Sequence, residues 1–129
     1  MKTAVLGTGM VGQAIATKLI QLGHEVKMGS RSGHNEKATA WISNNGPAAS
    51  QGTFAEAASF GEIVFNCTKG EIALEVLKQA GNENLKGKIL IDISNPLDFS
   101  KGMPPTLLIV NDNSLGEEIQ KLLPDTHVV

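Results

Sequence analysis

A glycine-rich loop near the start of the chain has the spacing of a pyrophosphate-binding site. Gly7, Gly9 and Gly12 follow a short apolar run at residues 3–6, and a helical pattern begins directly after them. A strand that turns through such a loop into a helix directs backbone N–H groups and the positive end of the helix dipole at one point. We therefore predict a dinucleotide site rather than an ordinary flexible turn. The residues expected to contact this ligand are Gly7, Thr8, Gly9, Met10, Val11 and Gly12.

Residues after the second predicted strand indicate which dinucleotide is bound. A site for NAD or FAD normally carries an Asp or Glu about 20 residues after the loop, where it binds the ribose 2′-hydroxyl. Residues 27–32 contain no acid, whereas Ser30 and Arg31 offer a hydroxyl and a guanidinium fork to a 2′-phosphate. Lys37 and His34 could close the same pocket. We expect NADP as cofactor; the alternative is that Arg31 and Lys37 are solvated loop cations.

Polar residues after the fourth and fifth predicted strands are candidates for the other half of the ligand. Thr68 and Asn95 follow these strands, and the carboxyl ends of parallel strands flank the crevice that receives a cofactor. We expect both to contact the nicotinamide ribose or ring. Cys67 has no partner from a catalytic motif and is interpreted as a buried or half-buried thiol, and Asp92 as a structural carboxylate.

The sequence predicts no catalytic residue and no metal site. The three histidines are scattered, and no His, Cys, Asp or Glu cluster has the spacing of metal ligands. No serine stands in a GxSxG motif. Hydride transfer needs no protein nucleophile, because the cofactor carries the chemistry. A sequence without a predicted catalytic residue is thus compatible with a reductase or dehydrogenase.

Short strand-like runs alternate with helical patterns along the chain. This alternation predicts an α/β fold, a doubly wound (Rossmann) parallel sheet of about six strands with helices on both faces. Thr53 with Glu56, and Ser114 with Glu117, have the spacing of capping boxes. Residues 94–113 form a long segment without a clear helix, which is typical of a functional loop. We expect strands near 2–7, 25–29, 51–53, 62–67, 88–93 and 127–129, and helices near 10–22, 35–45, 54–59, 70–80 and 115–123.

Composition narrows the function classes. The 129 residues, 41% of them hydrophobic, are enough for one core and one domain. A net charge of −2 offers no broad basic surface, so no nucleic-acid partner is expected. No stretch approaches the roughly 20 apolar residues of a membrane span. Together with the single cysteine and the lack of a signal peptide, this predicts a cytoplasmic protein without a membrane partner.

Several segments resemble one family over nearly the whole chain. They read GTGMVGQAIATKL, GSRS, DISNPLD, PPTL and SLGEEIQKLLPDTHVV. The chain resembles the NADPH-dependent coenzyme F420 reductases, and is also similar to the cytosolic reductase domain of the STEAP ferric reductases. The resemblance implies NADP binding through Thr8 to Val11 and through Ser30 and Arg31. A family lysine corresponds to Lys37 across a one-residue shift.

The end of the chain departs from this family. Family members continue from the strand at His127 into a Lys-x-x-Asn segment and a smaller helical domain, which builds the deazaflavin pocket and much of the dimer contact. We expect residues 1–129 to be the NADP-binding Rossmann domain, with that C-terminal helical domain absent and a homo-oligomer left open. The resemblance implies hydride transfer between NADP(H) and a flavin or deazaflavin (F420-like) acceptor. The alternative is a non-catalytic NADP-binding or redox-sensing module.

Overall fold

The chain folds around one parallel sheet. The computed structural model describes residues 1–93, 117 and 119–129. Within these ranges, six strands lie in the order β3-β2-β1-β4-β5-β6, and every neighbouring pair is parallel. The predicted doubly wound Rossmann architecture is thereby confirmed. The strands are β1 (Lys2–Leu6), β2 (Glu25–Ser30), β3 (Ala49–Thr53), β4 (Ile63–Asn66), β5 (Ile89–Asp92) and β6 (His127–Val128).

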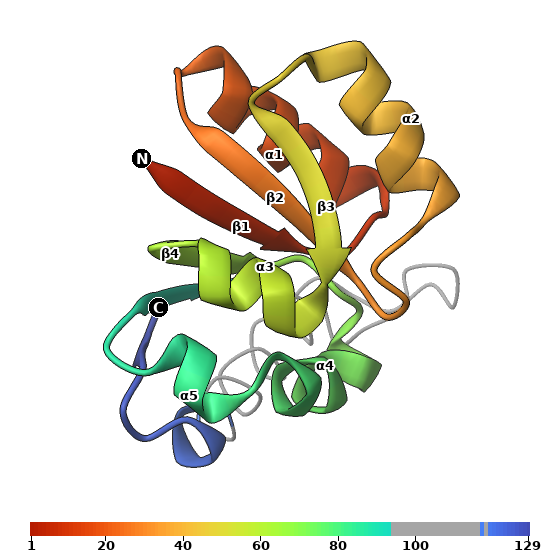
Figure 1. Ribbon diagram of the computed structural model, residues 1–129. Helices are drawn as coiled ribbons and strands as arrows, with labels where there is room; N and C mark the ends of the chain where they lie inside the picture. The colour runs from red at the N-terminus through yellow and green to blue at the C-terminus, as the bar shows by residue number, and fades with distance from the viewer. Residues whose placement is uncertain (94–116, 118) are drawn as a thin grey trace, which may run out of the picture.

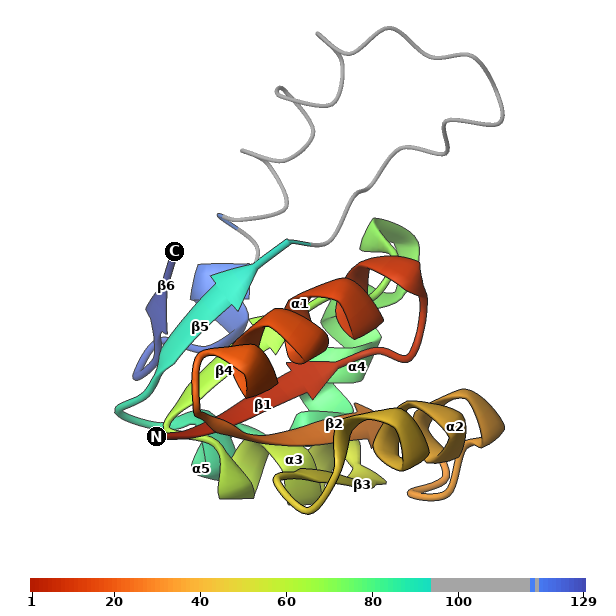
Figure 2. The ribbon, with the colours of Figure 1, turned by 90° about the horizontal axis from the view of Figure 1, so that it is seen from above.

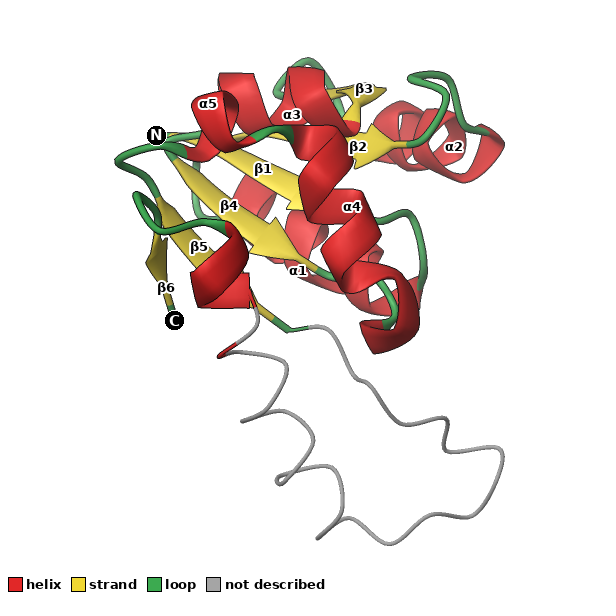
Figure 3. Cartoon of the chain, turned by 90° about the horizontal axis from the view of Figure 1, so that it is seen from below, coloured by secondary structure: helices red, strands yellow, loops and turns green. Residues whose placement is uncertain are grey.

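Helices cover both faces of this sheet (Figure 1). α1 and α2 lie against one face, and α3, α4 and α5 lie against the other, as the views from above and below show (Figures 2 and 3). Residues 117 and 119–122 are helical as well. The helices are α1 (Met10–Gln21), α2 (Glu36–Asn45), α3 (Phe54–Phe60), α4 (Ala73–Ala80) and α5 (Asn82–Leu85), with a 3-10 turn, η1 (Gly70–Ile72), before α4.

Successive side chains of β1 point to opposite faces of the sheet and pack into the two hydrophobic cores. Leu6 packs with the helices α3 to α5, where Val76 and Leu77 are fully buried, whereas Val5 faces α1 and α2. Trp41 of α2 closes the second core and donates from Nε1 to Thr17 Oγ1 at 3.2 Å. Because β1 is buried on both faces, the loop that follows it starts from a rigid position.

The fold differs from the sequence prediction in detail. Within the described residues, the short helix α5 was not predicted, and the helix expected from residue 70 begins with the 3-10 turn η1. The described helices cover β5 on one face: Leu90 is fully buried while Ile89 is 40% exposed. The Thr53–Glu56 capping box is confirmed. Ser114 and the segment 94–113 lie outside the described residues.

Candidate functional site

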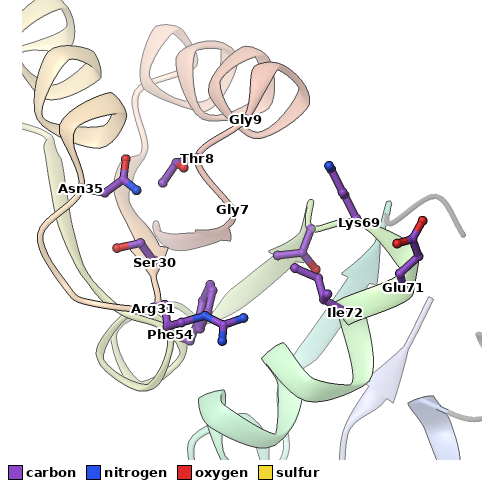
Figure 4. A pocket seen from close by; sticks show the side chains of 12 residues that line it. Gly7, Thr8, Gly9, Ser30, Arg31, Asn35, Phe54, Lys69, Glu71 and Ile72 are labelled. Atoms are coloured by element: carbon purple, nitrogen blue, oxygen red, sulfur yellow. The ribbon is translucent and has the colours of Figure 1, made fainter. Parts of the chain in front are cut away.

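A pocket lies at the carboxyl ends of the strands, where the strand order reverses between β1 and β4. Chain connections run outward from β1 to β3 on one side and from β4 to β6 on the other, and such a switch point leaves a crevice between the loops. The pocket has a volume of about 520 Å³ (Figure 4). Its lining residues come from the end of β2 and from the segments that follow β1 to β4. They are Gly7, Thr8, Gly9, Gly29, Ser30, Arg31, Asn35, Phe54, Thr68, Lys69, Glu71 and Ile72.

The three loop glycines serve different purposes. Gly7 has a φ of +119°, which side chains rarely adopt, and a Cβ on Gly12 would lie 2.6 Å from the carbonyl oxygen of Gly7. The fold itself therefore requires glycine at both positions. Gly9 has a φ of −78°, and a Cβ there would meet nothing within 4 Å. Packing within the chain does not explain this glycine, whereas close approach of a ligand to its backbone would.

The first turn of α1 is suited to an anion. Its N-cap, Gly9, supplies no side-chain acceptor, and no acidic residue stands in the first turn. The first backbone N–H groups of a helix lack intrahelical acceptors and carry the positive end of the dipole. Gln13 donates from Nε2 to the carbonyl oxygen of Thr8 at 2.9 Å, which fixes the loop against the helix. The turn can therefore bind a phosphate group through its backbone.

The end of β2 carries an unsatisfied buried hydroxyl. Ser30 is 6% exposed, and its Oγ is one of two buried side-chain atoms without a hydrogen-bond partner among the described residues, the other being His24 Nδ1. Such atoms are uncommon in folded proteins and favour a ligand or water as partner. Arg31 follows with an exposed side chain that lines the same pocket. Hydroxyl and guanidinium together suit a phosphate monoester.

Polar side chains at the ends of β4 and β5 form a connected chain of hydrogen bonds. Thr68 donates from Oγ1 to Asn66 Oδ1 at 2.7 Å, and its backbone N–H points to the same oxygen at 3.4 Å. Asn66 in turn donates from Nδ2 to Asp92 Oδ1 at 3.1 Å. Asn66 is fully buried and Thr68 lines the pocket. The register that pairs Asn66 with Asp92 across the parallel strands brings these groups together.

Cys67 has a thiol that is a poor nucleophile in the folded chain. It is half-buried against the core under α1, and burial, with a smaller contribution from the charge of Asp92, raises the pKa of its thiol to about 12. A thiol with that pKa stays protonated near neutral pH, and a thiol is a poor nucleophile compared with its thiolate.

The structure brings together half of the predicted site residues. Gly7, Thr8, Gly9, Ser30, Arg31 and Thr68 line one pocket. Lys37 has an exposed side chain in the first turn of α2 and is not among the lining residues. Asn95 lies outside the described residues. Met10, Val11 and Gly12 continue into α1 without lining the pocket. Their roles stay predictions.

Sequence reasoning missed the wall opposite Ser30. Figure 4 shows Lys69, Glu71 and Ile72 on that side, while Phe54 lies beneath Arg31. The residues 69–72 directly follow Thr68, so their place after the fourth strand was a signal that could have found them. Phe54 gave no such signal, because it reaches the pocket only through the pairing of β3 with β2.

Two further expectations concern the described part of the chain. No group of three or more His, Cys, Asp and Glu side chains among the described residues is arranged to hold a metal ion. No helix in this part of the chain is long and apolar enough to cross a membrane.

Comparison with known families gives one match to a family model. The model is described as NADP oxidoreductase, coenzyme F420-dependent, and matches residues 2–96. This range holds the glycine loop, the Ser30–Arg31 pair and the whole described pocket.

Individual relatives extend the similarity. The chain is 33% identical to the F420-dependent NADP reductase of Methanocaldococcus jannaschii over 138 residues, covering all of this chain and 61% of that protein. It is 37% identical over 129 residues to rat Metalloreductase STEAP3, covering 99% of this chain and 23% of that protein. A crystal structure assigned as an F420-dependent NADP reductase from Arthrobacter sp. FB24 superposes with a TM-score of 0.83 at 47% identity, over 99% of this chain and 60% of that chain. The chain thus spans less than two thirds of each of these relatives.

Proposed function

The chain belongs to the family of coenzyme F420-dependent NADP oxidoreductases, and on that premise we propose that its pocket binds NADP(H) for hydride exchange with a flavin or deazaflavin acceptor. The acceptor class comes from the names of the family and of its relatives. The cofactor assignment rests in addition on the chain's own residues.

The observation that carries the proposal is Ser30 Oγ beside Arg31, a buried hydroxyl with no hydrogen-bond partner among the described residues. A 2′-phosphate on the adenosine ribose would satisfy this hydroxyl and pair with the guanidinium, which gives charge-assisted hydrogen bonds. The acid that lines the described pocket is Glu71, and it lies on η1 across from Ser30 (Figure 4). A carboxylate beside Ser30 would repel the phosphate, and residues 27–32 contain none. The arrangement favours NADP over NAD.

The remaining parts of NADP have matching surroundings. The first turn of α1 supplies backbone N–H groups to the pyrophosphate, and the open backbone at Gly9 lets it approach closely. Phe54 and Ile72 offer apolar surface to the adenine ring between the two walls (Figure 4). Thr68, at the end of β4, and Asn95 are proposed to serve the nicotinamide ribose and ring.

The proposed mechanism needs no acid, base or nucleophile from the described chain. Bound NADPH supplies a hydride from its nicotinamide ring. The protein residues bind the phosphates, hold the adenosine end and orient the ring toward the acceptor. The protonated Cys67 thiol does not compete as a nucleophile.

Cofactor selectivity tests the proposal directly. NADPH should bind more tightly than NADH in calorimetry, because only NADPH carries the 2′-phosphate. Arg31→Ala should weaken NADPH binding by about ten- to hundredfold, the effect of one charge-assisted contact, and leave NADH binding nearly unchanged. Lys78→Ala, which removes an exposed cation in the last turn of α4 outside the pocket, is the matched control and should change neither affinity. Equal affinities of the wild type for the two cofactors would contradict the assignment.

Turnover separates the enzyme from a non-catalytic NADP-binding module. NADPH oxidation would be followed spectrophotometrically with F420 and with FMN, using this chain and a longer natural relative in parallel. Oxidation of NADPH by this chain with either acceptor supports the hypothesis that the chain is a reductase. Tight NADPH binding by both proteins, with turnover by the longer one alone, means that the acceptor side requires residues beyond these 129. Tight binding without turnover in either protein favours the non-catalytic module.

A further inference from the structure

The hydrogen-bond chain Asp92–Asn66–Thr68 has a defined direction. An ionised carboxylate only accepts hydrogen bonds, so the Asn66 side chain must present Nδ2 to Asp92, which it does at 3.1 Å. This contact fixes the orientation of the amide group and turns Oδ1 toward Thr68. The orientation of a buried amide is thus set by a charge one strand away.

Because of this hydrogen-bond direction, the Thr68 hydroxyl can act toward the pocket only as an acceptor. A threonine hydroxyl has a single hydrogen, and here that hydrogen is donated to Asn66 Oδ1 at 2.7 Å. No hydrogen bond from a described residue to Oγ1 occupies its lone pairs, which can accept from a ligand in the pocket that Thr68 lines. Thr68 can therefore accept a hydrogen bond from the ligand but cannot donate one to it.

Such an acceptor discriminates between the parts of a dinucleotide. Phosphate oxygens are acceptors and gain nothing from Thr68, whereas ribose hydroxyls can donate to it. Strand order indicates which ribose is near. Ser30 is the last residue of β2 on one side of β1, and Thr68 follows β4 on the other side. With the pyrophosphate at the loop after β1 and the 2′-phosphate at Ser30, the nicotinamide half extends toward β4.

We propose that Asn66 and Asp92 are positioning residues that hold the Thr68 hydroxyl as an acceptor for a hydroxyl group of the nicotinamide ribose. The inference rests on the proposed function, since it takes NADP as the ligand. Neither Asn66 nor Asp92 contacts the ligand in this scheme; they act through Thr68. The competing explanation is that the three side chains merely close the end of the sheet around a buried polar residue.

The experiment compares two ligands that differ in the nicotinamide half. Titration calorimetry with NADP⁺ and with 2′,5′-ADP, which retains the adenosine and its 2′-phosphate, separates the two ends of the site. Thr68→Val should weaken NADP⁺ binding by about three- to tenfold, the effect of one neutral hydrogen bond, and change 2′,5′-ADP affinity less than twofold. Asn66→Leu should show the same ligand-specific loss although residue 66 does not touch the ligand.

A double-mutant cycle tests whether the residues act together. If Asn66 works through Thr68, the double variant should lose no more NADP⁺ affinity than Thr68→Val alone. Asp92→Asn keeps the side-chain shape and lets the Asn66 amide turn either way, so it should produce an intermediate loss and replaces Asn66→Leu where that variant is unstable. Thr68→Ser retains the hydroxyl and should bind NADP⁺ like the wild type.

A control threonine lies at the opposite end of the sheet. Thr3 is buried, and its hydroxyl donates to the carbonyl oxygen of Glu25 at 2.9 Å. Thr3→Val should leave the ratio of NADP⁺ to 2′,5′-ADP affinity at the wild-type value. Equal weakening of both ligands by the Thr68 and Asn66 variants, or no weakening of NADP⁺, would overturn the inference while the cofactor assignment stands. A wild type that binds neither ligand would overturn the proposed function and the inference together.

Discussion

At the residue scale, substitution by alanine should lower the stability of the chain much more at Gly12 than at Gly9. Gly12→Ala should destabilise the chain by about 1–3 kcal/mol, because its Cβ would lie 2.6 Å from the Gly7 carbonyl oxygen, a backbone atom that cannot easily move. Gly9→Ala has open space and should cost less than about 1 kcal/mol, the effect of a poorer N-cap. Urea unfolding measures both.

The same pair separates stability from binding. Gly9→Ala should bind NADPH more weakly than the wild type, since its methyl group would stand where the pyrophosphate approaches the backbone. Calorimetry on the folded variant checks this. Unchanged NADPH affinity in Gly9→Ala would show that the ligand does not pass close to this residue and would remove the functional reason for the glycine.

The raised pKa of the Cys67 thiol predicts how its contribution to stability changes with pH. Its pKa is raised to about 12 in the folded chain, so the folded state holds the proton that an unfolded thiol releases at lower pH. This contribution to stability is fully present below the unfolded pKa near 9.0 and is lost as the pH rises toward the folded value. At pH 8, alkylation by iodoacetamide should be at least about tenfold slower in the native protein than in urea, because less of the thiol is ionised. Equal rates would contradict the buried, protonated thiol.

At the residue level, the sequence identified residues that lie close together in the fold where the signal is local. The glycine spacing and the missing acid after β2 lie within short segments, and the structure brings Gly7, Ser30 and Arg31 to one pocket. Asn66 and Asp92 were not recognised as a pair, because their contact depends on the register of β4 against β5. Long-range register is not encoded in the spacing of residues along one segment.

At the element scale, the capping box of α3 holds one wall of the pocket. Thr53 Oγ1 accepts from the Glu56 backbone N–H at 3.1 Å, and the Thr53 backbone N–H donates to Glu56 Oε1 at 2.9 Å. Thr53→Ala should therefore lower the free energy of unfolding by about 1 kcal/mol. Ser43→Ala, which removes an exposed hydroxyl bonded to the Thr39 carbonyl oxygen inside α2, is the control and should be neutral. An equal effect of both substitutions would rule out a specific role for the cap.

The acid of this cap adds a pH dependence. Hydrogen bonds from Thr53 lower the pKa of Glu56 below 4.5. A carboxyl with a depressed pKa contributes stability above its unfolded pKa and loses it as the pH falls through the folded value. The stability difference between wild type and Glu56→Gln should thus be larger at pH 7 than at pH 3 in urea titrations. A difference that does not change with pH would mean that the charged form is not favoured.

The sequence predicted which segments form strands and helices better than it predicted which helices cover each strand. The alternation of apolar and helical segments predicted β1 to β6 and the main helices, because period and capping are local properties. Coverage of β5 is unequal on its two faces, because Leu90 is fully buried while Ile89 is 40% exposed. Which helix covers which strand depends on long-range packing, such as that of α1 over β1 and β2, and no strand sequence contains that information.

At the scale of the whole molecule, one ligand should stabilise four separate segments at once. The pocket is lined by the end of β2 and by the segments after β1, β2, β3 and β4, so a bound NADP⁺ would link elements that are far apart in sequence. At a free concentration of 100 times the dissociation constant, binding adds about 2.7 kcal/mol to the free energy of unfolding. Hydrogen exchange with mass spectrometry should show slower exchange around residues 7–12, 30–35, 54 and 68–72, with less change in β6. Protection confined to residues 30–35 would mean that the chain recognises the phosphorylated adenosine alone, and the crevice at the switch point would then not be a full dinucleotide site.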